Sequence, residues 1–369
     1  MTAHSQSSPA GTWRGVWSGG LVAVATVIWG AVATDSVGLV LRDPDHVAAL
    51  YLGLVGLGVV GLVFLDVALR ARAQAGGGRP SRAAMAAVRR ERWTPARCTA
   101  AGLALVGFYA TYMAYRNLKA IVPLVRPDVN FDRPLAEIDR DMFLGHDPAA
   151  LLHSLMGTGV VTHALSAFYV AFIVFLPLTI GLALVFSTDV RPALFYVTAQ
   201  SINWVLGIVS YLLLPSLGPI YFDPGAFADL PGSEVTRLQG VLMQQRVDFL
   251  ADPSTGTPQS IAAFASLHIS MSFTAALAAH LLGLPKRLRI ALWVWLAVTT
   301  VGTVYLGWHY FVDDIAGVVM GALALLLARA FTGLDLRGER ARRRRERAAV
   351  EQPSWDGSAQ PAGASARTN

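Results

Sequence analysis

Residues 305–332, YLGWHYFVDDIAGVVMGALALLLARAFT, are the most informative stretch about the fold, because a short polar sequence leads directly into a long apolar run. A helix needs about 20 mostly apolar residues to cross a hydrocarbon core of about 30 Å. Residues 311–332 reach that length and are apolar on all sides beyond their first turn, as expected for a helix surrounded by lipid. They predict a transmembrane helix that begins with two carboxylates, Asp313 and Asp314.

Similar apolar stretches occur along most of the chain. It is 54% hydrophobic and 15% charged, with a mean hydropathy of +0.48, which is far from the balance of a soluble domain. We predict an all-α, polytopic membrane helical bundle of about eight transmembrane helices. The expected spans are residues 19–41, 47–69, 98–122, 162–187, 191–214, 260–283, 288–307 and 311–332. We expect the first span to be retained, with cleavage near Ala33 as the alternative.

The charges between the spans predict the orientation. Three segments are strongly basic: residues 70–97, with eight arginines and a single acid, residues 286–289, and residues 337–347. Short basic loops stay in the cytoplasm, so these segments and both termini are expected there. Residues 126–161 and 215–259 are acidic on balance and are expected outside.

Two further features limit the class of protein. The formal charge of +6 is explained by these basic loops, and no groove-reading motif is present, so we expect no nucleic-acid partner. Cys98 is the single cysteine, which excludes an intramolecular disulfide. Within the outer segment, residues 134–156 have helical periodicity interrupted at Gly145 and Pro148. They predict either a broken amphipathic helix on the membrane surface or a partly buried loop.

A first cluster of chemically capable residues lies at the outer end of the third span, in KAIVPLVRP, residues 119–127. Lys119 and Arg126 are seven residues apart and would share a helical face, although Pro123 must bend the chain between them. Cations are disfavoured on the outer side, so the pair indicates an anionic partner, and the two groups suit phosphate oxygens. The alternative is that both side chains reach toward the membrane interface.

A second cluster begins the sixth span, in AAFASLHISMSF, residues 262–273. The start of a helix offers free backbone N–H groups and the positive end of its dipole, which favour an anion. Ser266 could donate to a phosphate oxygen or merely cap the helix. His268 could act on the same anion or be a structural interfacial histidine.

A third cluster, residues 305–317, contains His309 and Asp313, which are four residues apart and therefore adjacent on a helix. A carboxylate in this position fixes the imidazole tautomer and stabilises the imidazolium formed if the other nitrogen attacks an electrophile. Asp314 is one residue too far round, and the alternative is a purely structural pair. By the predicted topology, all three clusters meet at the outer face, which indicates one anion-binding site.

On these residues the chain resembles the type 2 phosphatidic acid phosphatase superfamily of helical membrane enzymes, which has three signature blocks. KAIVPLVRP is similar to the first block, ASLH to the second and residues 305–317 to the third. The resemblance covers roughly residues 100–332. Residues 117–148, GPIYF at 218–222 and GWHYFVDDIAG at 307–317 are most similar to the inositolphosphotransferase-like branch, which includes inositol phosphorylceramide synthases.

The resemblance implies a mechanism without cofactor or metal. His309 would attack phosphorus to form a phosphohistidine, Asp313 would orient it, and His268 would serve as general acid and then as base. The phosphoryl oxygens would be held by Lys119, Arg126 and Ser266. The substrate would be a lipid phosphate or diphosphate, with water or an alcohol as acceptor. The enzyme would be a multi-pass protein of the plasma (cell) membrane with its site facing outward.

The sequence departs from the family pattern at two places. Gly302 and Thr303 stand where many phosphatases of the superfamily have a serine and an arginine, so one phosphate-binding cation is missing. This weakens a plain phosphatase assignment and is compatible with the transferase-like branch. Ala265 replaces the proline that usually begins the second block, which leaves Ser266 and His268 in register.

The expected organisation has four parts: a disordered cytoplasmic N-terminus (1–18), two extra transmembrane helices with a basic cytoplasmic loop (19–97), the phosphatidic acid phosphatase type 2-like catalytic membrane domain (98–332) and a basic disordered cytoplasmic tail (333–369). A plain lipid phosphate or polyprenyl diphosphate phosphatase is the main alternative. A zinc site built from His268, His309 and Asp313 is a second. A non-catalytic transporter or scaffold is the alternative of another class. The sequence does not specify the oligomeric state.

Overall fold

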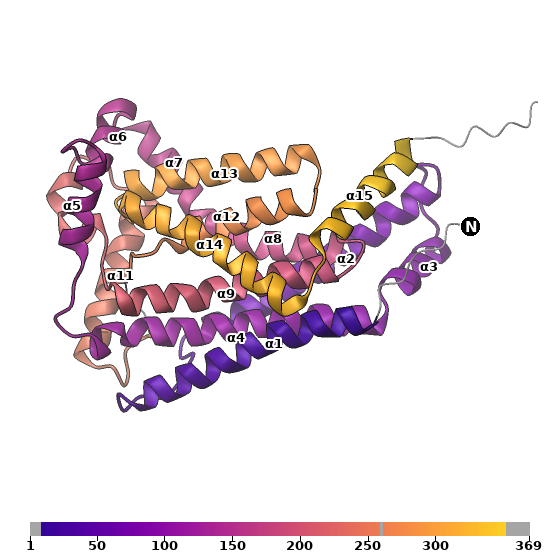
Figure 1. Ribbon diagram of the computed structural model, residues 1–369, viewed down its shortest axis with the longest axis horizontal. Coiled ribbons are helices and arrows are strands. Elements are labelled where there is room, and N and C mark those ends of the chain that lie inside the picture. The colour runs from indigo at the N-terminus through magenta and orange to yellow at the C-terminus, as the bar shows by residue number, and fades with distance from the viewer. Residues whose placement is uncertain (1–8, 259–260, 352–369) are drawn as a thin grey trace, which may run out of the picture.

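The computed structural model describes residues 9–258 and 261–351 and is helical throughout, with no strand among those residues (Figure 1). Within them, seven helical spans are long and apolar enough to cross a membrane. They are α1 (Pro9–Asp35), α2 (Val47–Gln74), α4 (Pro95–Val125), α7 (Val160–Val170) continued by α8 (Phe172–Phe186), α9 (Arg191–Leu213), α13 (Lys286–Tyr305) and α14 (Phe311–Thr332). The predicted all-α membrane bundle is therefore confirmed.

The predicted number of eight spans is not confirmed, because in the described part of the expected span, residues 261–283, only α12 (Leu267–Leu281) is helical. Fifteen residues rise about 22 Å, which is less than a hydrocarbon core. The preceding backbone is satisfied elsewhere: the amides of Phe264 and Ala265 donate to the hydroxyls of Ser216 and Ser210, each at 3.0 Å. Because these donors already have partners at the end of α9, the helix starts late.

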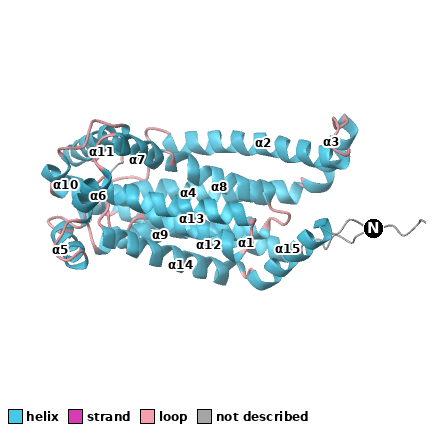
Figure 2. Ribbon diagram, turned by 90° about the horizontal axis from the view of Figure 1, so that it is seen from above, coloured by secondary structure: helices cyan, strands magenta, loops and turns pink. Residues whose placement is uncertain are grey.

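Helix α9 forms the centre of the bundle, with α4, α12 and α14 packed against it (Figure 2). Most of α9 is buried, and its polar side chains form hydrogen bonds inside the core, such as Asn203 Nδ2 to Thr274 Oγ1 at 2.9 Å. Helix α14 approaches α12 closely, since a Cβ atom on Gly317 would lie 2.6 Å from the Ser266 carbonyl oxygen. This contact brings the first turns of α12 and α14 together.

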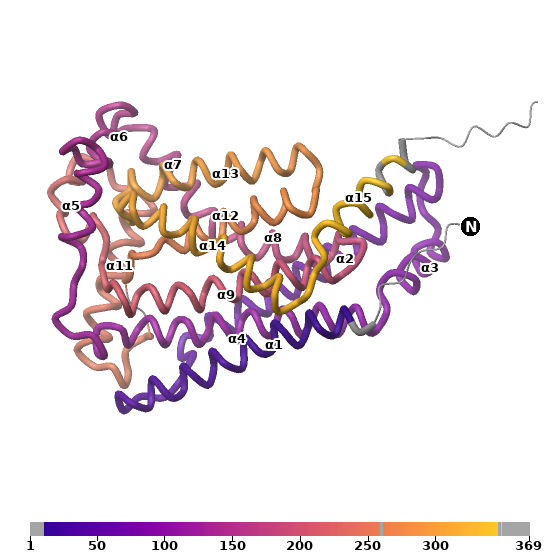
Figure 3. Tube along the Cα trace, viewed as in Figure 1, coloured from indigo at the N-terminus to yellow at the C-terminus, as the bar shows by residue number. Residues whose placement is uncertain are grey.

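The two ends of the bundle differ, as the path of the chain shows (Figures 1 and 3). We call one the capped end, because short helices and loops cover it: α5 (Asp132–Met142), α6 (Pro148–Met156), α10 (Pro219–Phe222), the 3-10 helix η1 (Pro224–Phe227) and α11 (Glu234–Ala251). The opposite end carries the basic helices α3 (Arg82–Arg92) and α15 (Leu336–Glu351). Basic and acidic segments thus lie at opposite ends, as the predicted topology requires.

Of the two alternatives predicted for residues 134–156, the structure shows the broken helix, as α5 and α6. Asp147 begins the second piece, because its carboxylate accepts from the Ala149 and Ala150 amides at 2.8 and 3.2 Å. Asp132 and Asp139 of α5 are buried, so this helix packs onto the bundle with these two carboxylates inward, while Glu137 and Asp141 are exposed.

Residues 1–18 and 333–369 were expected to be disordered, but the structure describes a helix in part of each segment. Helix α1 begins at Pro9. Within this helix, Arg14 Nε donates to the Phe331 carbonyl at 3.1 Å, which joins α1 to the end of α14. In α15, the Glu339 carboxylate pairs with Arg342 and Arg343 one turn later, which stabilises a helix in this charged sequence. Residues 1–8 and 352–369, where disorder was also expected, lie outside the described residues.

Candidate active site

His309 lies in the tight connection between α13 and α14. The amides of Trp308 and His309 both donate to the Thr303 carbonyl, at 3.0 and 3.3 Å, which folds the chain back at the end of α13. Gly307 permits this turn with φ of 71°, and its missing Cβ makes room for the Phe227 ring, which would otherwise lie 2.7 Å away. The turn presents His309 at the start of α14.

The His309 imidazole is paired with Asp313. Nδ1 of His309 lies 3.3 Å from Oδ2 of Asp313, and the same oxygen accepts the Tyr310 amide at 3.0 Å. The His309 residue is 4% exposed and Asp313 is fully buried. The adjacency predicted from the spacing is therefore present, and it leaves Nε2 of His309 available for chemistry. Asp314 faces elsewhere, because its Oδ2 accepts from the Thr303 hydroxyl at 2.9 Å.

The surroundings of His309 favour its neutral form. It lies in the connection outside the helices on either side, and burial lowers its pKa to about 3, with the Lys119 charge adding to the effect. A neutral imidazole with Nδ1 hydrogen-bonded to a carboxylate has a free electron pair on Nε2. This is the form that a nucleophilic histidine requires.

His268 lies in the first turn of α12 and faces the same space as His309. The two ring centroids are 6.0 Å apart with planes inclined by 59°. Tyr169 and Phe172, from α7 and α8, hold the His268 ring at centroid distances of 4.5 and 4.4 Å. The two imidazoles, 41 residues apart in the sequence, can therefore contact one small group bound between them.

Both histidines and Lys119 line one cavity of about 340 Å³. Lys119 projects from α4, with Nζ 6.0 Å and 5.8 Å from the ring centroids of Tyr115 and Tyr211. A cation, two imidazoles and mostly apolar walls suit a ligand with an anionic head and an apolar body. Along the part of the chain that the structure describes, no three His, Cys, Asp or Glu side chains are arranged to hold a metal ion.

Ser266 and Arg126 are not among the residues that line this cavity. Ser266 is fully buried at the N-terminal end of α12, beside the Asp314 carboxyl group, and its amide donates to the Asp313 carbonyl at 3.1 Å. Arg126 does not line the cavity, because α4 ends at Val125 and the Arg126 guanidinium donates to the Leu212 carbonyl at 2.9 Å. The structure thus brings Lys119, His268 and His309 together and leaves Arg126 outside the group.

Two carboxylates that the sequence analysis did not identify accept hydrogen bonds from groups next to the site. Asp139 accepts the Phe311 and Val312 amides, at 2.6 and 2.9 Å, and so caps α14 just before Asp313. Asp132 accepts the amides of residues 217 and 218, at 2.8 to 3.0 Å, and the Tyr310 hydroxyl at 3.1 Å. Burial raises the pKa of Asp139, although the two amides act against it. The signal was their seven-residue spacing on an amphipathic segment.

A charged cluster at the edge of the cavity was also missed. Arg116 lines the cavity one turn from Lys119, and its guanidinium bonds Asp45 at 2.6 and 2.9 Å and Asp43 at 3.0 Å. Both acids lie in the connection between α1 and α2. The sequence feature that could have identified both acids is DPD, residues 43–45. It lies between two predicted spans, in a segment expected outside.

This arrangement, an all-helical membrane bundle with a buried His–Asp pair opposite a second histidine, defines a class of membrane enzyme. A family model described as the PAP2 superfamily matches residues 133–327, which is just over half of the 369 residues. The chain therefore belongs to the PAP2 superfamily, which indicates a membrane lipid phosphatase or phosphotransferase. The matched segment contains His268, His309 and Asp313, whereas Lys119 and Arg126 precede it.

Neither a search of curated proteins nor a search of solved structures returned a match. The finer resemblance to the inositolphosphotransferase-like branch is not confirmed by the family match.

Proposed function

We propose that this protein transfers or hydrolyses the phosphoryl group of a lipid phosphate, with His309 as the nucleophile. The observation that carries the proposal is the placement of His309. Its Nδ1 faces the fully buried Asp313 at 3.3 Å, while its ring faces His268 across a cavity that Lys119 also lines. Each group has the chemistry that the reaction needs at that position.

In the first half of the reaction, Nε2 of His309 attacks phosphorus and a P–N bond forms. The P–O bond to the departing lipid oxygen breaks on the opposite side, and His268 donates a proton to that oxygen. Asp313 accepts the hydrogen bond from Nδ1–H and stabilises the positive charge that develops on the ring. The product is a phosphohistidine.

In the second half, water or an alcohol attacks phosphorus, and the P–N bond breaks. His268 accepts the proton of the attacking hydroxyl, which restores both imidazoles to their starting states. Lys119, Ser266 and the N-terminal end of α12 would stabilise the phosphoryl oxygens as charge redistributes over them. Arg126 would contribute after its guanidinium leaves the Leu212 carbonyl.

Transfer to an alcohol, as in inositolphosphotransferase-like enzymes, is the form of the reaction that we favour over plain hydrolysis. The support is Thr303, which stands where many phosphatases of the superfamily have an arginine and whose hydroxyl is engaged with Asp314 at 2.9 Å. We further propose that the site faces outward from the plasma membrane with both termini in the cytoplasm. The basic segments at the opposite end of the bundle support this orientation.

The test uses purified protein and a panel of lipid phosphates and diphosphates, with and without an alcohol acceptor, scored for free phosphate and for new lipid product. His309→Ala should abolish both products and the acid-labile ³²P label on the protein. His163→Ala, at an exposed position on α7 away from this cavity, is the matched control and should keep wild-type turnover. Wild-type turnover in His309→Ala would refute the assignment.

A further inference from the structure

The cavity beside His309 extends from the capped end toward the middle of the bundle. On α4 its lining runs from Lys119 to Phe108, eleven residues or about 16 Å along the helix axis. On α9 it runs from Tyr211 to Trp204, about 10 Å. The charged groups lie at the capped end, while the deep end is lined by Phe108, Trp204 and Leu176. One cavity therefore combines a charged end, at the capped end of the bundle, with an apolar floor.

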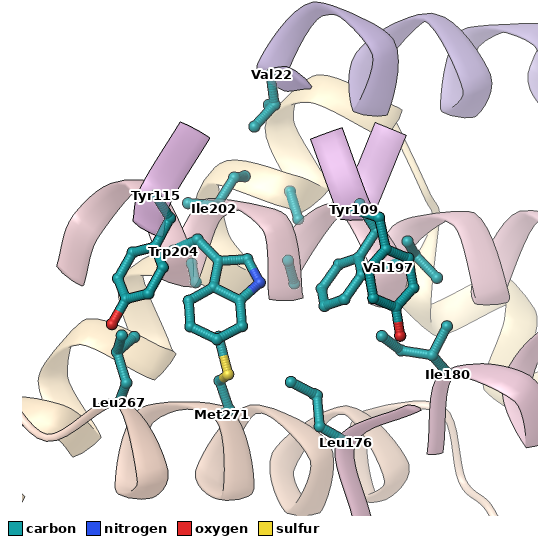
Figure 4. Close-up of a cluster of buried hydrophobic side chains, with 14 of the residues drawn as sticks. Val22, Tyr109, Tyr115, Leu176, Ile180, Val197, Ile202, Trp204, Leu267 and Met271 are labelled. Carbon is teal, nitrogen blue, oxygen red and sulfur yellow. The ribbon is translucent and has the colours of Figure 1, made fainter. Parts of the chain in front are cut away.

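Ten of the residues that line this cavity are Phe, Tyr or Trp, and they come from segments far apart in the sequence. The Tyr115 and Trp204 rings, from α4 and α9, lie 4.4 Å apart, and Leu176 of α8 lies across from them (Figure 4). The ring centroids of Tyr51 of α2 and Tyr112 of α4 are 6.4 Å apart. Helix α2 packs against both α4 and α8, and its Tyr51 lines the cavity on that side.

The size of the cavity limits what it can hold. A protein cavity of about 150 Å³ binds benzene, which has six carbons, so a cavity of about 340 Å³ has room for roughly a dozen carbons. One hydrocarbon chain of about a dozen carbons fills this space. Two chains of that length do not fit.

We propose that the cavity binds a single hydrocarbon chain of the substrate, about a dozen carbons deep, with the attached phosphate at His309. The inference rests on the proposed function, and it assigns the substrate class as a lipid phosphate that presents one linear or isoprenoid chain to the protein. Helices α2 and α4 lie outside the family-matched residues 133–327. Chain selectivity is therefore shared between α2 and α4, which lie outside the matched residues, and α8 and α9, which lie within them.

Burial of each methylene gives about 0.8 kcal/mol, which is roughly a fourfold gain in affinity. Affinity, expressed against the aqueous ligand concentration in equilibrium with the nanodiscs, should therefore rise about fourfold per carbon and level off near twelve carbons, where the floor is reached. Leu176 is 6% exposed and forms part of that floor, so its size sets the length at which the plateau begins. A larger side chain there shortens the accepted chain, and a smaller one lengthens it.

The experiment measures binding of alkylphosphonates of 4 to 18 carbons to the full-length protein in nanodiscs, by ligand-induced thermal shift. Phosphonates are not hydrolysed, so the result does not depend on turnover. Leu176→Trp should move the plateau to chains shorter by three or four carbons, and Leu176→Ala should move it to longer chains. The control is Leu178→Trp on the same helix, which is 46% exposed and outside the cavity lining. Since partition into the bilayer is common to all variants, differences from this control report the cavity.

A plateau that moves in opposite directions in the two Leu176 variants and stays in place in Leu178→Trp supports the inference, even if no lipid phosphate is turned over. The same plateau in all variants overturns it, even if His309-dependent phosphate release is observed. Where Leu176→Trp does not fold, Leu176→Phe gives the same direction with a smaller change in volume. A farnesylphosphonate arm, compared with the saturated 12-carbon ligand, identifies whether the cavity prefers an isoprenoid or a saturated chain.

Discussion

Asp139 offers the sharpest test of how the site is held in place. It is 3% exposed, and its carboxylate accepts two amides at the start of α14, from Phe311 at 2.6 Å and Val312 at 2.9 Å. Asp313 follows directly in the chain, so this cap fixes the carboxylate that orients His309. Replacing Asp139 with alanine leaves two buried N–H groups at a helix start without these partners.

The size of the effect follows from these two bonds. A hydrogen bond to a charged group contributes about 1.5–3 kcal/mol, so the pair sets an upper limit of about 6 kcal/mol. Helix caps in other proteins contribute about 0.5–2 kcal/mol when replaced by alanine. Because burial raises the pKa of Asp139 and so opposes its charged form, we expect a loss of about 2 kcal/mol in the free energy of unfolding.

The effect on catalysis should be larger than the effect on stability. A shift of about 1 Å at a reacting group costs on the order of 100-fold in rate, so Asp139→Ala should lower kcat by about that factor. The assay is phosphoryl release by purified protein at a temperature at which the variant is folded, alongside its thermal unfolding. Asp139→Asn, which keeps one acceptor oxygen, should recover part of both losses. Asp141→Ala, exposed on the same helix, is the control. Equal turnover in Asp139→Ala and Asp141→Ala would refute the reasoning.

Three further predictions concern the site and its edge. Asp313→Asn should lower kcat at least about 100-fold, because the amide no longer fixes the tautomer of His309; wild-type kcat would exclude the orienting role. Turnover should survive dialysis against a strong chelator, and activity that is lost and then restored by zinc would instead favour a metal site. The pKa of Asp45 is lowered below its usual value of 3.8, chiefly by the hydrogen bond from Arg116. The ionised Asp45 should therefore stabilise the connection between α1 and α2 fully above pH 3.8. This stabilisation should be lost as the pH falls through the lower pKa of Asp45 in the folded protein. Limited proteolysis of that connection with acidification should show this loss in wild type and not in Asp45→Asn.

Much of the architecture follows from the sequence alone, because hydropathy and helical spacing are local properties. The long apolar runs identified the helices of the bundle, with α14 beginning and ending where residues 311–332 predicted. The four-residue spacing of His309 and Asp313 places two side chains on one helical face whatever the rest of the fold does. The first turn of α14 is buried against α12. This burial distinguishes the His309 and Asp313 pair from other pairs with the same spacing.

Other features depend on contacts between distant segments, so only the tertiary structure decided them. Helix α12 starts at Leu267 because α9 and its following loop take the preceding amides, and Arg126 turns to the Leu212 carbonyl because α4 ends just before it. The seven-residue spacing of Asp132 and Asp139 was visible, but their partners are not local. They lie in the loop after α9, 85 and 86 residues away, and on α14 and its preceding loop, more than 170 residues away. The cavity is likewise lined by residues of α2, α4, α7, α8, α9, α11 and α12 together. A hydrogen-bond partner or a cavity wall belongs to two segments at once, and no pattern within one of them specifies the other.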